Sequence, residues 1–161
     1  MNIDFVIANE ADAKVIAVLR QKIWSTTYRG IYPDDVIDEF DYSWHETRNL
    51  AIIGDKNSHV YLLRYGHDVI GYFIFQDKAT VYMQSLYILS DYQRMGIGSR
   101  ALKIVHNYCR NNGYKIFYCN CNPHNRTARA FYCSKGGVVI ERDEGHNDKQ
   151  EDQITFEFAV N

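Results

Sequence analysis

A short glycine-containing segment, Gln93-Arg94-Met95-Gly96-Ile97-Gly98, has the residue types and spacing of an anion-binding turn. Residues 81–89 before it are rich in β-branched and aromatic side chains, which is typical of a strand. Residues 99–112 after it carry apolar side chains at steps of three and four, which predicts a helix ending near Gly113. The glycines therefore lie at a helix N-terminus, where unpaired N–H groups and the helix dipole favour an anion. We expect this segment to bind a phosphate or pyrophosphate group.

The same glycines also fit the dinucleotide-binding pattern G-x-G-x-x-G/A, through Gly96, Gly98 and Ala101. A Rossmann fold would place an acidic residue about 20 positions further on, where it holds a ribose. That region reads Phe117-Tyr118-Cys119-Asn120 and contains no carboxylate. A nicotinamide-dependent oxidoreductase is therefore supported by the glycine pattern alone, and an ordinary strand-to-helix turn is a further alternative.

A second motif follows at Asn125-Arg126-Thr127-Ala128-Arg129-Ala130-Phe131-Tyr132, with Gly136 after it. The glycine segment and N-x-x-A-x-x-F-Y-x-x-x-G together resemble the GNAT superfamily of acetyl-CoA-dependent N-acetyltransferases, from the first predicted strand to the last. The resemblance implies an α/β (α+β) GNAT fold, with a mixed, mostly antiparallel central sheet of about seven strands flanked by four or more helices. It also implies acetyl-CoA as the co-substrate.

The resemblance gives roles to residues at matching positions. Tyr132 matches the family's catalytic acid, and a phenol with a pKa near about 10 can protonate a thiolate while staying protonated at neutral pH. The alternative is that Tyr132 only packs its helix onto the sheet. Asn125 matches a cofactor-binding asparagine and also suits a helix N-cap. The cofactor-binding positions are Leu86, Tyr87, Ile88, Arg94, Met95, Gly96, Ile97, Gly98, Ser99 and Asn125.

The general base is where the sequence departs from the family pattern. Many relatives carry glutamate at the position of Gln84, and similar peptide N-terminal acetyltransferases carry it at that of Asn120. An amide does not accept a proton usefully, so a water chain, His124, or an acceptor amine that is already partly neutral are the alternatives. The base is unassigned, and a non-catalytic acetyl-CoA-binding sensor or interaction module is the alternative to an enzyme.

The segment between the first helix and the second strand builds one wall of the acceptor site in this family. The predicted acceptor-binding residues are Trp24, Tyr28 and Tyr32, which offer flat apolar surface. Nearby carboxylates would favour a cationic amine, unless they only form a solvated face: Asp34, Asp35, Asp38, Glu39 and Asp41. The expected reaction is acetyl transfer to a primary amine by direct attack in a ternary complex. A small amine, a polyamine and a peptide amine all fit as the acceptor.

The rest of the chain supplies the elements that position these residues. We expect a strand over 4–8, a helix from Asn9 to about Ser25, a short helix starting at Pro33 and a helix over 44–53. Further strands are expected over 60–64, 69–76, 115–122, 138–142 and 153–160. No repeat or linker interrupts the pattern, so residues 1–161 are expected to form a single domain.

Composition excludes several classes of protein. The net charge of -2 gives no electrostatic footprint for nucleic acid, although Arg94 and Arg100 could form a local basic pocket for CoA. No apolar run reaches the roughly 18 residues of a membrane span, and a signal-peptide layout is absent, so we expect a cytoplasmic protein. An amine acceptor is the expected partner, with a homodimer as an open alternative. The cysteine spacing predicts free thiols and no metal site: Cys109, Cys119, Cys121 and Cys133.

Overall fold

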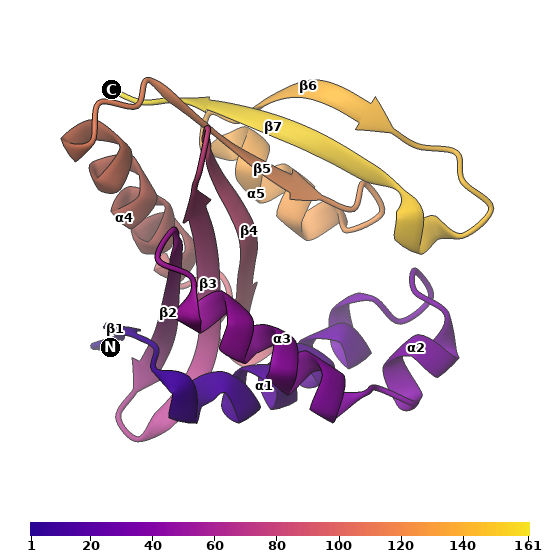
Figure 1. The fold of residues 1–161 in the computed structure, drawn as a ribbon. Helices are drawn as coiled ribbons and strands as arrows, with labels where there is room; N and C mark the ends of the chain where they lie inside the picture. Colours follow the sequence, from indigo (N-terminus) through magenta and orange to yellow (C-terminus); the bar gives the residue numbers. More distant parts are fainter.

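A seven-stranded sheet forms the centre of the molecule in the computed structural model, which describes residues 1–161 (Figure 1). The strand order is β1-β2-β3-β4-β5-β7-β6, and all neighbours are antiparallel except the parallel pair β4 and β5. The strands are β1 Asp4–Ile7, β2 Ser58–Tyr65, β3 Asp68–Asp77, β4 Val81–Ile88, β5 Ile116–Cys121, β6 Val138–Asp143 and β7 Gln153–Ala159. The mixed, mostly antiparallel sheet expected from the sequence is confirmed.

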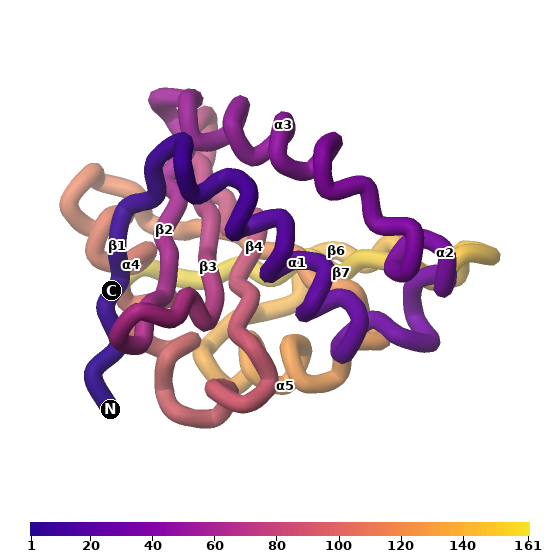
Figure 2. The backbone as a smooth tube through the Cα atoms, turned by 90° about the horizontal axis from the view of Figure 1, so that it is seen from below, coloured from indigo at the N-terminus to yellow at the C-terminus, as the bar shows by residue number.

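Five α-helices flank the sheet: α1 Ala13–Thr27, α2 Asp34–Asp38, α3 Tyr42–Gly54, α4 Ile97–Asn111 and α5 Arg126–Ser134. Seen from below, α1 and α3 run side by side across one face of β2, β3 and β4, and they pack on each other (Figure 2). Residues of α4 and α5 belong to the larger core cluster on the other face of the sheet. The expectation of four or more helices is confirmed, and none of the helices is long and apolar enough to cross a membrane.

The strand β3 illustrates why helices cover both faces of the sheet. Its residues 69–75 are apolar except for Gly71. Tyr72 and Ile74 belong to the core cluster shared with α1, whereas Phe73 and Phe75 belong to the cluster shared with α4. A strand that is buried on both faces is continuously apolar in sequence, and each fully buried side chain of this size contributes about 1.5–3 kcal/mol.

The boundaries of α1 and α2 differ slightly from expectation. Asn9 accepts a hydrogen bond from the Ala11 N–H at 2.9 Å, and Asp12 accepts one from the Asn9 N–H at 2.9 Å. This capping box first closes a 3₁₀ turn at Glu10–Asp12, after which α1 continues to Thr27 rather than ending at Ser25. Pro33 precedes α2 as its N-cap and is not its first helical residue.

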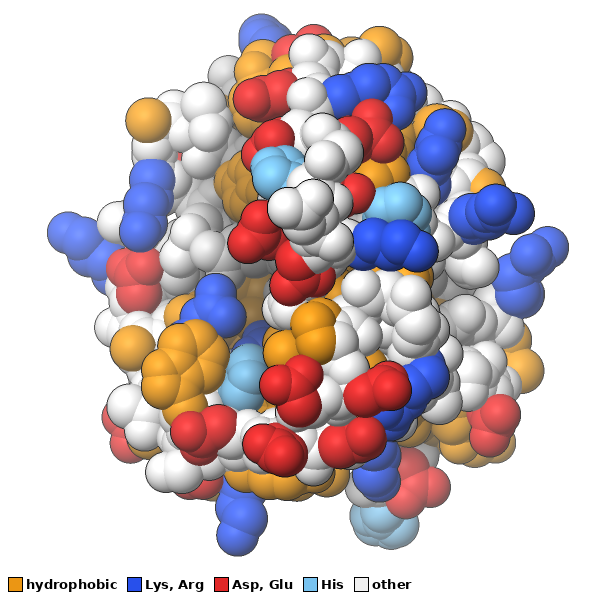
Figure 3. Space-filling view, turned by 90° about the vertical axis from the view of Figure 1, so that its right-hand side faces the viewer, with side chains coloured by type: hydrophobic (Ala, Val, Ile, Leu, Met, Phe, Trp, Pro, Cys, Tyr) orange, Lys and Arg blue, Asp and Glu red, His pale blue; other side chains and the backbone are white.

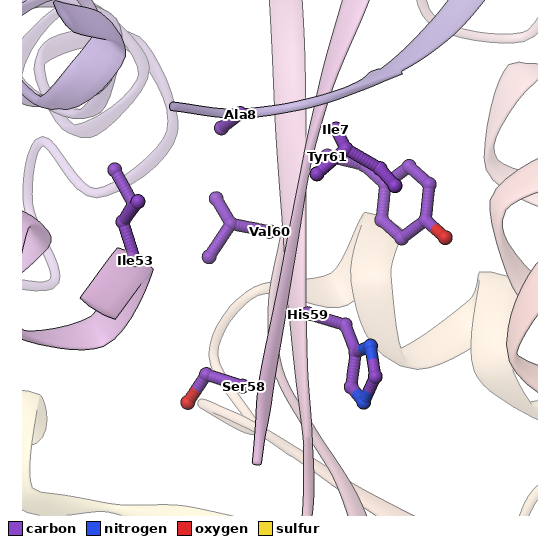
Figure 4. Close-up of a pocket in the computed structure, with 7 residues that line it drawn as sticks. All are labelled: Ile7, Ala8, Ile53, Ser58, His59, Val60 and Tyr61. Carbon is purple, nitrogen blue, oxygen red and sulfur yellow. The ribbon is translucent and has the colours of Figure 1, made fainter. Parts of the chain in front are cut away.

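A small cavity of about 80 Å³ lies at the β1–β2 edge of the sheet (Figure 4). Ala8, Ile53 and Val60 enclose it with apolar side chains, while His59 and Tyr61 project on the other side of β2. Its apolar lining gathers no set of charged groups. The candidate functional site therefore lies elsewhere, at the middle of the sheet.

Candidate active site

The sheet opens between β4 and β5. The two strands pair only over Tyr82–Met83 and Tyr118–Cys119, and beyond these residues they diverge, as Figure 1 shows. A β-bulge where this pairing ends leaves Gln84 as an extra residue in β4 opposite β3. Residues 85–88 stay paired to β3 on one side and present an unpaired backbone edge to the gap on the other. Such an edge can pair with an extended, amide-containing ligand.

The N-terminus of α4 provides the predicted anion-binding turn. Arg94 and Gly96 both adopt left-handed backbone conformations, with φ of 65° and 77°, and no side chain caps the helix. The first loop-to-helix hydrogen bond runs from the Arg100 N–H to the Gly96 carbonyl, so the N–H groups of residues 97–99 have no partner in the chain. Three free N–H groups at the positive end of a 15-residue helix are the arrangement that favours binding of an anion.

Gly98 and Arg100, near this turn, have structural roles that the sequence did not indicate. A Cβ on Gly98 would lie 2.9 Å from Cζ of Phe131, so this glycine permits close packing of α4 against α5 rather than approach of a ligand. Arg100 donates from Nη2 to the Ile3 carbonyl at 2.8 Å, and its guanidinium lies 4.7 Å from the ring centroid of Phe5. Arg100 therefore anchors the N-terminal strand to α4, and Arg94 is the cation left at the turn.

Tyr132, the predicted acid, lies in α5 with only 6% of its surface exposed. Its ring packs on Phe156 and Phe158, at centroid distances of 5.5 and 6.1 Å. Burial, together with Cys119 and other neighbours in the sheet, raises the pKa of Tyr132 well above its usual value. Tyr132 therefore packs α5 onto the sheet, as the alternative interpretation held. Its phenol also stays protonated at neutral pH. Its role as an acid is a prediction that these contacts permit.

Asn125 connects the start of α5 to the acceptor-side segment. Its Oδ1 accepts from the Ala128 N–H at 3.1 Å, which confirms the predicted N-cap. Its Nδ2 donates to the Tyr28 hydroxyl at 3.4 Å. Tyr28 in turn stacks on Tyr32, with ring centroids 4.3 Å apart. Burial raises the pKa of Tyr28 and of Tyr32, so both phenols are neutral hydrogen-bonding groups.

The amides at the two candidate base positions stand where the strands part. Gln84 donates from Nε2 to Oε1 of Gln76 at 2.7 Å, and Asn120 donates from Nδ2 to Oε1 of Gln153 at 2.7 Å. The Oδ1 atom of Asn120 is buried and has no hydrogen-bond partner. Neither residue can remove a proton, but this unpaired acceptor lies at the opening of the sheet.

His124, the other base candidate, belongs to a cluster around one buried carboxylate. Its Nε2 lies 2.8 Å from Oδ2 of Asp152, while Nδ1 of His146 lies 2.8 Å from Oδ1 of the same residue. The His146 N–H also donates to Asp152 at 3.0 Å. These hydrogen bonds, that of His124 first, hold the pKa of Asp152 at about 2, and Asp152 raises the pKa of His146. The contacts join residues 28 and 6 positions apart, so the sequence offered no signal for this cluster.

A cavity of about 290 Å³ lies on the α1 and α3 side of β4, behind the opening of the sheet. The β-bulge brings the consecutive residues Gln84 and Ser85 into its wall. Of the three predicted acceptor-binding residues, Trp24 lines this cavity; Tyr28 and Tyr32 belong to the aromatic cluster beside it, in which Trp24 meets Tyr32 edge to face at 5.2 Å. The complete lining is Arg20, Trp24, Arg48, Ile52, Tyr82, Gln84, Ser85 and Tyr87.

Arg20 is the most unusual residue of this cavity and was missed by sequence reasoning. Its guanidinium donates from Nε to the Tyr72 hydroxyl at 2.9 Å and from Nη1 to Nδ1 of His45 at 2.9 Å. Burial, with Arg20 nearby, lowers the pKa of His45 to about 4, so the neutral ring accepts the hydrogen bond. One signal was available in the sequence, because Arg20 interrupts the apolar face that Ile16 and Ile23 define on α1.

The carboxylates expected to attract a cation lie outside this cavity. Asp34 and Asp38 pair with Arg29 at 3.3 and 2.9 Å, on the exposed surface around α2. Figure 3 shows acidic side chains gathered over α2 and again over the β6–β7 connection. The carboxylates around α2 form the solvated face that was the alternative interpretation, and no acidic residue lines the cavity.

A seven-stranded sheet that opens between parallel central strands, with an uncapped helix N-terminus beside the opening, defines the GNAT fold. The family model for the acetyltransferase (GNAT) family matches residues 19–136. The chain belongs to this family, and its sequence resemblance to the superfamily is thereby confirmed.

Individual relatives agree with this assignment. PaiA N-acetyltransferase from Thermoplasma acidophilum, solved in complex with coenzyme A, has the same fold with a TM-score of 0.83 and 17% identity, over 99% of both chains. A tyramine N-feruloyltransferase of Nicotiana tabacum is 30% identical over 88 residues, which is 55% of this chain but 39% of that longer protein. N-alpha-acetyltransferase 50 of Danio rerio is 27% identical over 80% of this chain and 70% of that protein.

Proposed function

We propose that this protein is an N-acetyltransferase that moves the acetyl group of acetyl-CoA to a primary amine, by direct attack in a ternary complex. The observation that carries the proposal is the arrangement around the β4–β5 opening. An anion-binding helix end and an unpaired strand edge serve the cofactor, and a separate cavity on the α1 side of β4 serves the acceptor. Residues 1–161 form the single domain of this proposal, because both core clusters include residues of β2 and β3.

In this proposal the cofactor follows the predicted positions. The free N–H groups of Ile97, Gly98 and Ser99 bind the pyrophosphate, with Arg94 as the nearby cation. The open edge of Leu86, Tyr87 and Ile88 pairs with the amide groups of the pantetheine arm. Asn125 and Met95 complete the predicted set around these two contacts. The thioester then reaches the point where β4 and β5 separate.

The proposed reaction has one covalent step at the carbonyl carbon. The neutral amine nitrogen attacks this carbon, the carbon–sulfur bond breaks, and the products are an N-acetyl amide and free CoA thiol. Tyr132 gives its phenolic proton to the departing sulfur, and the proton lost by the amine passes to water, from which Tyr132 recovers its own.

Direct attack is favoured over an acetyl-cysteine intermediate by the state of the nearby thiols. All four cysteines are free, as expected. Burial raises the pKa of Cys121 to about 12, and it raises the pKa of Cys119 as well. The thiolate is the nucleophilic form of cysteine, and at neutral pH these side chains supply almost none of it.

The activities for which the relatives are named support an amine acceptor. One is named for a tyramine acceptor and another for protein N-terminal acetylation. Both acceptors present a primary amine, so the class of nucleophile is common to them.

A second candidate function is an acetyl-CoA-binding module without turnover, and the amides Gln84 and Asn120 at the usual base positions favour it. Release of CoA thiol from acetyl-CoA across a panel of amines decides between the two. An enzyme releases thiol with at least one amine, at a rate that rises with the concentration of that amine. A binding module gains thermal stability with acetyl-CoA but releases no thiol. Stabilisation by NAD instead of acetyl-CoA would contradict both.

The absence of a carboxylate base predicts how the rate depends on pH. If the amine must lose its proton to water, kcat/KM rises with pH until the acceptor itself is deprotonated, so the apparent pKa follows the acceptor. The test is a pH profile for two acceptors whose amine pKa values differ. A shared apparent pKa would show that the protein supplies a base, and His124→Gln would then be the first variant to measure.

A further inference from the structure

The acceptor cavity is positively charged. Two arginines, Arg20 and Arg48, contribute to its wall, and no aspartate or glutamate does. The other polar groups of the lining are neutral: the Trp24 indole, the Gln84 amide, the Ser85 hydroxyl and two phenols. At about 290 Å³ the cavity is near the lower end of the roughly 300–1,000 Å³ typical of small-molecule sites.

Arg20 is a buried cation without a counter-charge. Only 4% of its surface is exposed, and its partners are the neutral groups of Tyr72, His45 and Asn49, the last at 3.5 Å. These contacts engage Nε and Nη1, and Nη2 donates to no group of the chain. An unpaired buried charge is costly, so a residue held in this way is suited to an anionic partner that comes from outside the chain.

Two further residues of the lining, Trp24 and Arg48, also carry polar groups without a hydrogen-bonding or charged partner in the chain. The Nε1 atom of Trp24 is a buried donor without any hydrogen-bond partner. Arg48 forms no salt bridge, and its guanidinium lies 5.7 Å from the ring centroid of Trp44. One wall of the cavity thus combines Arg20, Arg48 and the Trp24 ring, and Ser85 of the bulged strand lies on the other.

We propose that this cavity binds a carboxylate of the acceptor, so that the acceptor is an amino acid or a similarly small amine that also carries a carboxylate. The inference rests on the proposed function and names its substrate class. Guanidinium groups bind carboxylates through paired hydrogen bonds, and two of them repel a polyamine. The carboxylates around α2, which were expected to attract a cationic amine, therefore act outside the cavity.

Matched pairs of acceptors that differ only by the carboxylate test the proposal. Suitable pairs are tyrosine with tyramine, tryptophan with tryptamine, lysine with cadaverine, and arginine with agmatine, each measured as kcat/KM for thiol release. We expect the amino acid to be preferred by about tenfold or more in the pair that fits the cavity. A preference for the decarboxylated amine in every pair that reacts would overturn the proposal.

Arg48 gives the sharper test, because it is exposed and its replacement does not remove a buried hydrogen-bond network. Arg48→Gln should reduce the preference for the amino acid about tenfold, mainly through KM, and Arg48→Lys should restore part of it. Arg110→Gln, which removes one exposed positive charge at the far end of α4, should leave the preference unchanged. Equal losses for both members of each pair in Arg48→Gln would contradict a carboxylate contact.

A binding measurement keeps this inference separate from the proposed function. If no amine releases thiol, the acetyltransferase proposal fails, but the cavity can still be examined by calorimetry. The probes are 3-(4-hydroxyphenyl)propionate and its neutral amide, neither of which has an amine to acetylate. We expect the acid to bind at least about tenfold more tightly to the wild-type protein and to lose this advantage in Arg48→Gln. Equal affinities of the acid and the amide for the wild-type protein would overturn the inference.

Discussion

Tyr132 has an observed packing role and a proposed chemical role. Its ring is part of the core formed with β7, and its phenol remains neutral because burial disfavours the phenolate. A buried phenol with a raised pKa is a weaker acid in the ground state, but a CoA thiolate formed beside it would be buried too and would take the proton readily. The residue therefore suits the transient protonation of a leaving group.

The substitution Tyr132→Phe separates these roles. It keeps the ring and removes the proton donor, so we expect the melting temperature to change little and kcat to fall by roughly 10²- to 10⁴-fold. Stopped assays of thiol release, paired with thermal unfolding, measure both effects. Wild-type turnover in a correctly folded variant would show that the tyrosine is purely structural.

At the level of single residues, the sequence predicted those whose structural role is indicated by their immediate neighbours in the chain. Gly96 and Asn125 carry local signals, a helix start and an N-cap, and both appear as expected. Arg48 and Asp152 carry no such signal, and for Arg20 the only signal is that it interrupts the apolar face of α1. The roles of all three depend on partners brought together by tertiary packing. Their chemistry could not be seen before the fold was known.

The contact between α4 and α5 joins the two segments proposed to form the cofactor site. Gly98 lies in the first turn of α4, and the ring of Phe131 fills the space that a side chain there would need. Since Tyr132 is the next residue, any shift of Phe131 moves the predicted acid. The two motifs recognised in the sequence are therefore physically joined at this contact.

We expect Gly98→Ala to lower both stability and turnover, because its Cβ would lie 2.9 Å from the Phe131 ring and the ring must shift. Overpacking of this kind typically costs about 1–3 kcal/mol. The double variant Gly98→Ala/Phe131→Leu should recover much of the loss, and thermal unfolding of the single and double variants measures it. An additive double variant, with no recovery, would argue against a steric cause.

The Asp152 cluster ties the start of α5 to the β6–β7 connection, and its pH dependence can be derived. Asp152, with a pKa of about 2 in the fold and about 3.9 when unfolded, contributes stability above pH about 4 that is lost as the pH falls toward 2. His146, whose pKa is raised, contributes stability below pH about 6.5 that is lost as the pH rises past its folded value.

The difference in melting temperature between wild type and Asp152→Asn should therefore be largest between about pH 4 and 6.5. It should shrink on both sides of this window, and it is measured by thermal unfolding across the range. The variant His67→Gln, a change in the β2–β3 turn, serves as a control with little effect. A difference that is constant across pH would mean that the cluster acts only through neutral hydrogen bonds.

At the scale of the molecule, the sequence predicted the element order and most boundaries, because apolar periodicity is strong in α4 and in the strands. Exceptions lie at ends, such as the 3₁₀ turn before α1, where a cap fixes the start but not the type of helix. The proposed cofactor positions could be named from the sequence, because most of them lie in two short runs, residues 86–88 and 94–99. Of the cavity proposed for the acceptor, the sequence named Trp24 but not Arg20, Arg48 or Ser85, because these three come from separate elements.

Hydrogen exchange can test how the two parts of the sheet are connected. Strands β1 to β4 and strands β5 to β7 are joined by only two registered residue pairs. We expect acetyl-CoA to slow amide exchange at residues 85–88 and in β5 together, because a ligand in the gap contacts both. Protection confined to the N-terminus of α4 would show that only the phosphate groups are bound and that the gap stays open.

Because β4 and β5 share only two registered residue pairs, a ligand bound between them would stabilise the folded state. A ligand that fills the gap pairs with the free edge of β4 and can dissociate again. At a free concentration of about 100 times its Kd, it adds about 2.7 kcal/mol to the free energy of unfolding. That gain is a large fraction of the stability of an ordinary domain. If acetyl-CoA binds as proposed, its loss from that concentration raises the population of opened, protease-sensitive molecules about a hundredfold, and the lifetime of the protein follows the supply of acetyl-CoA.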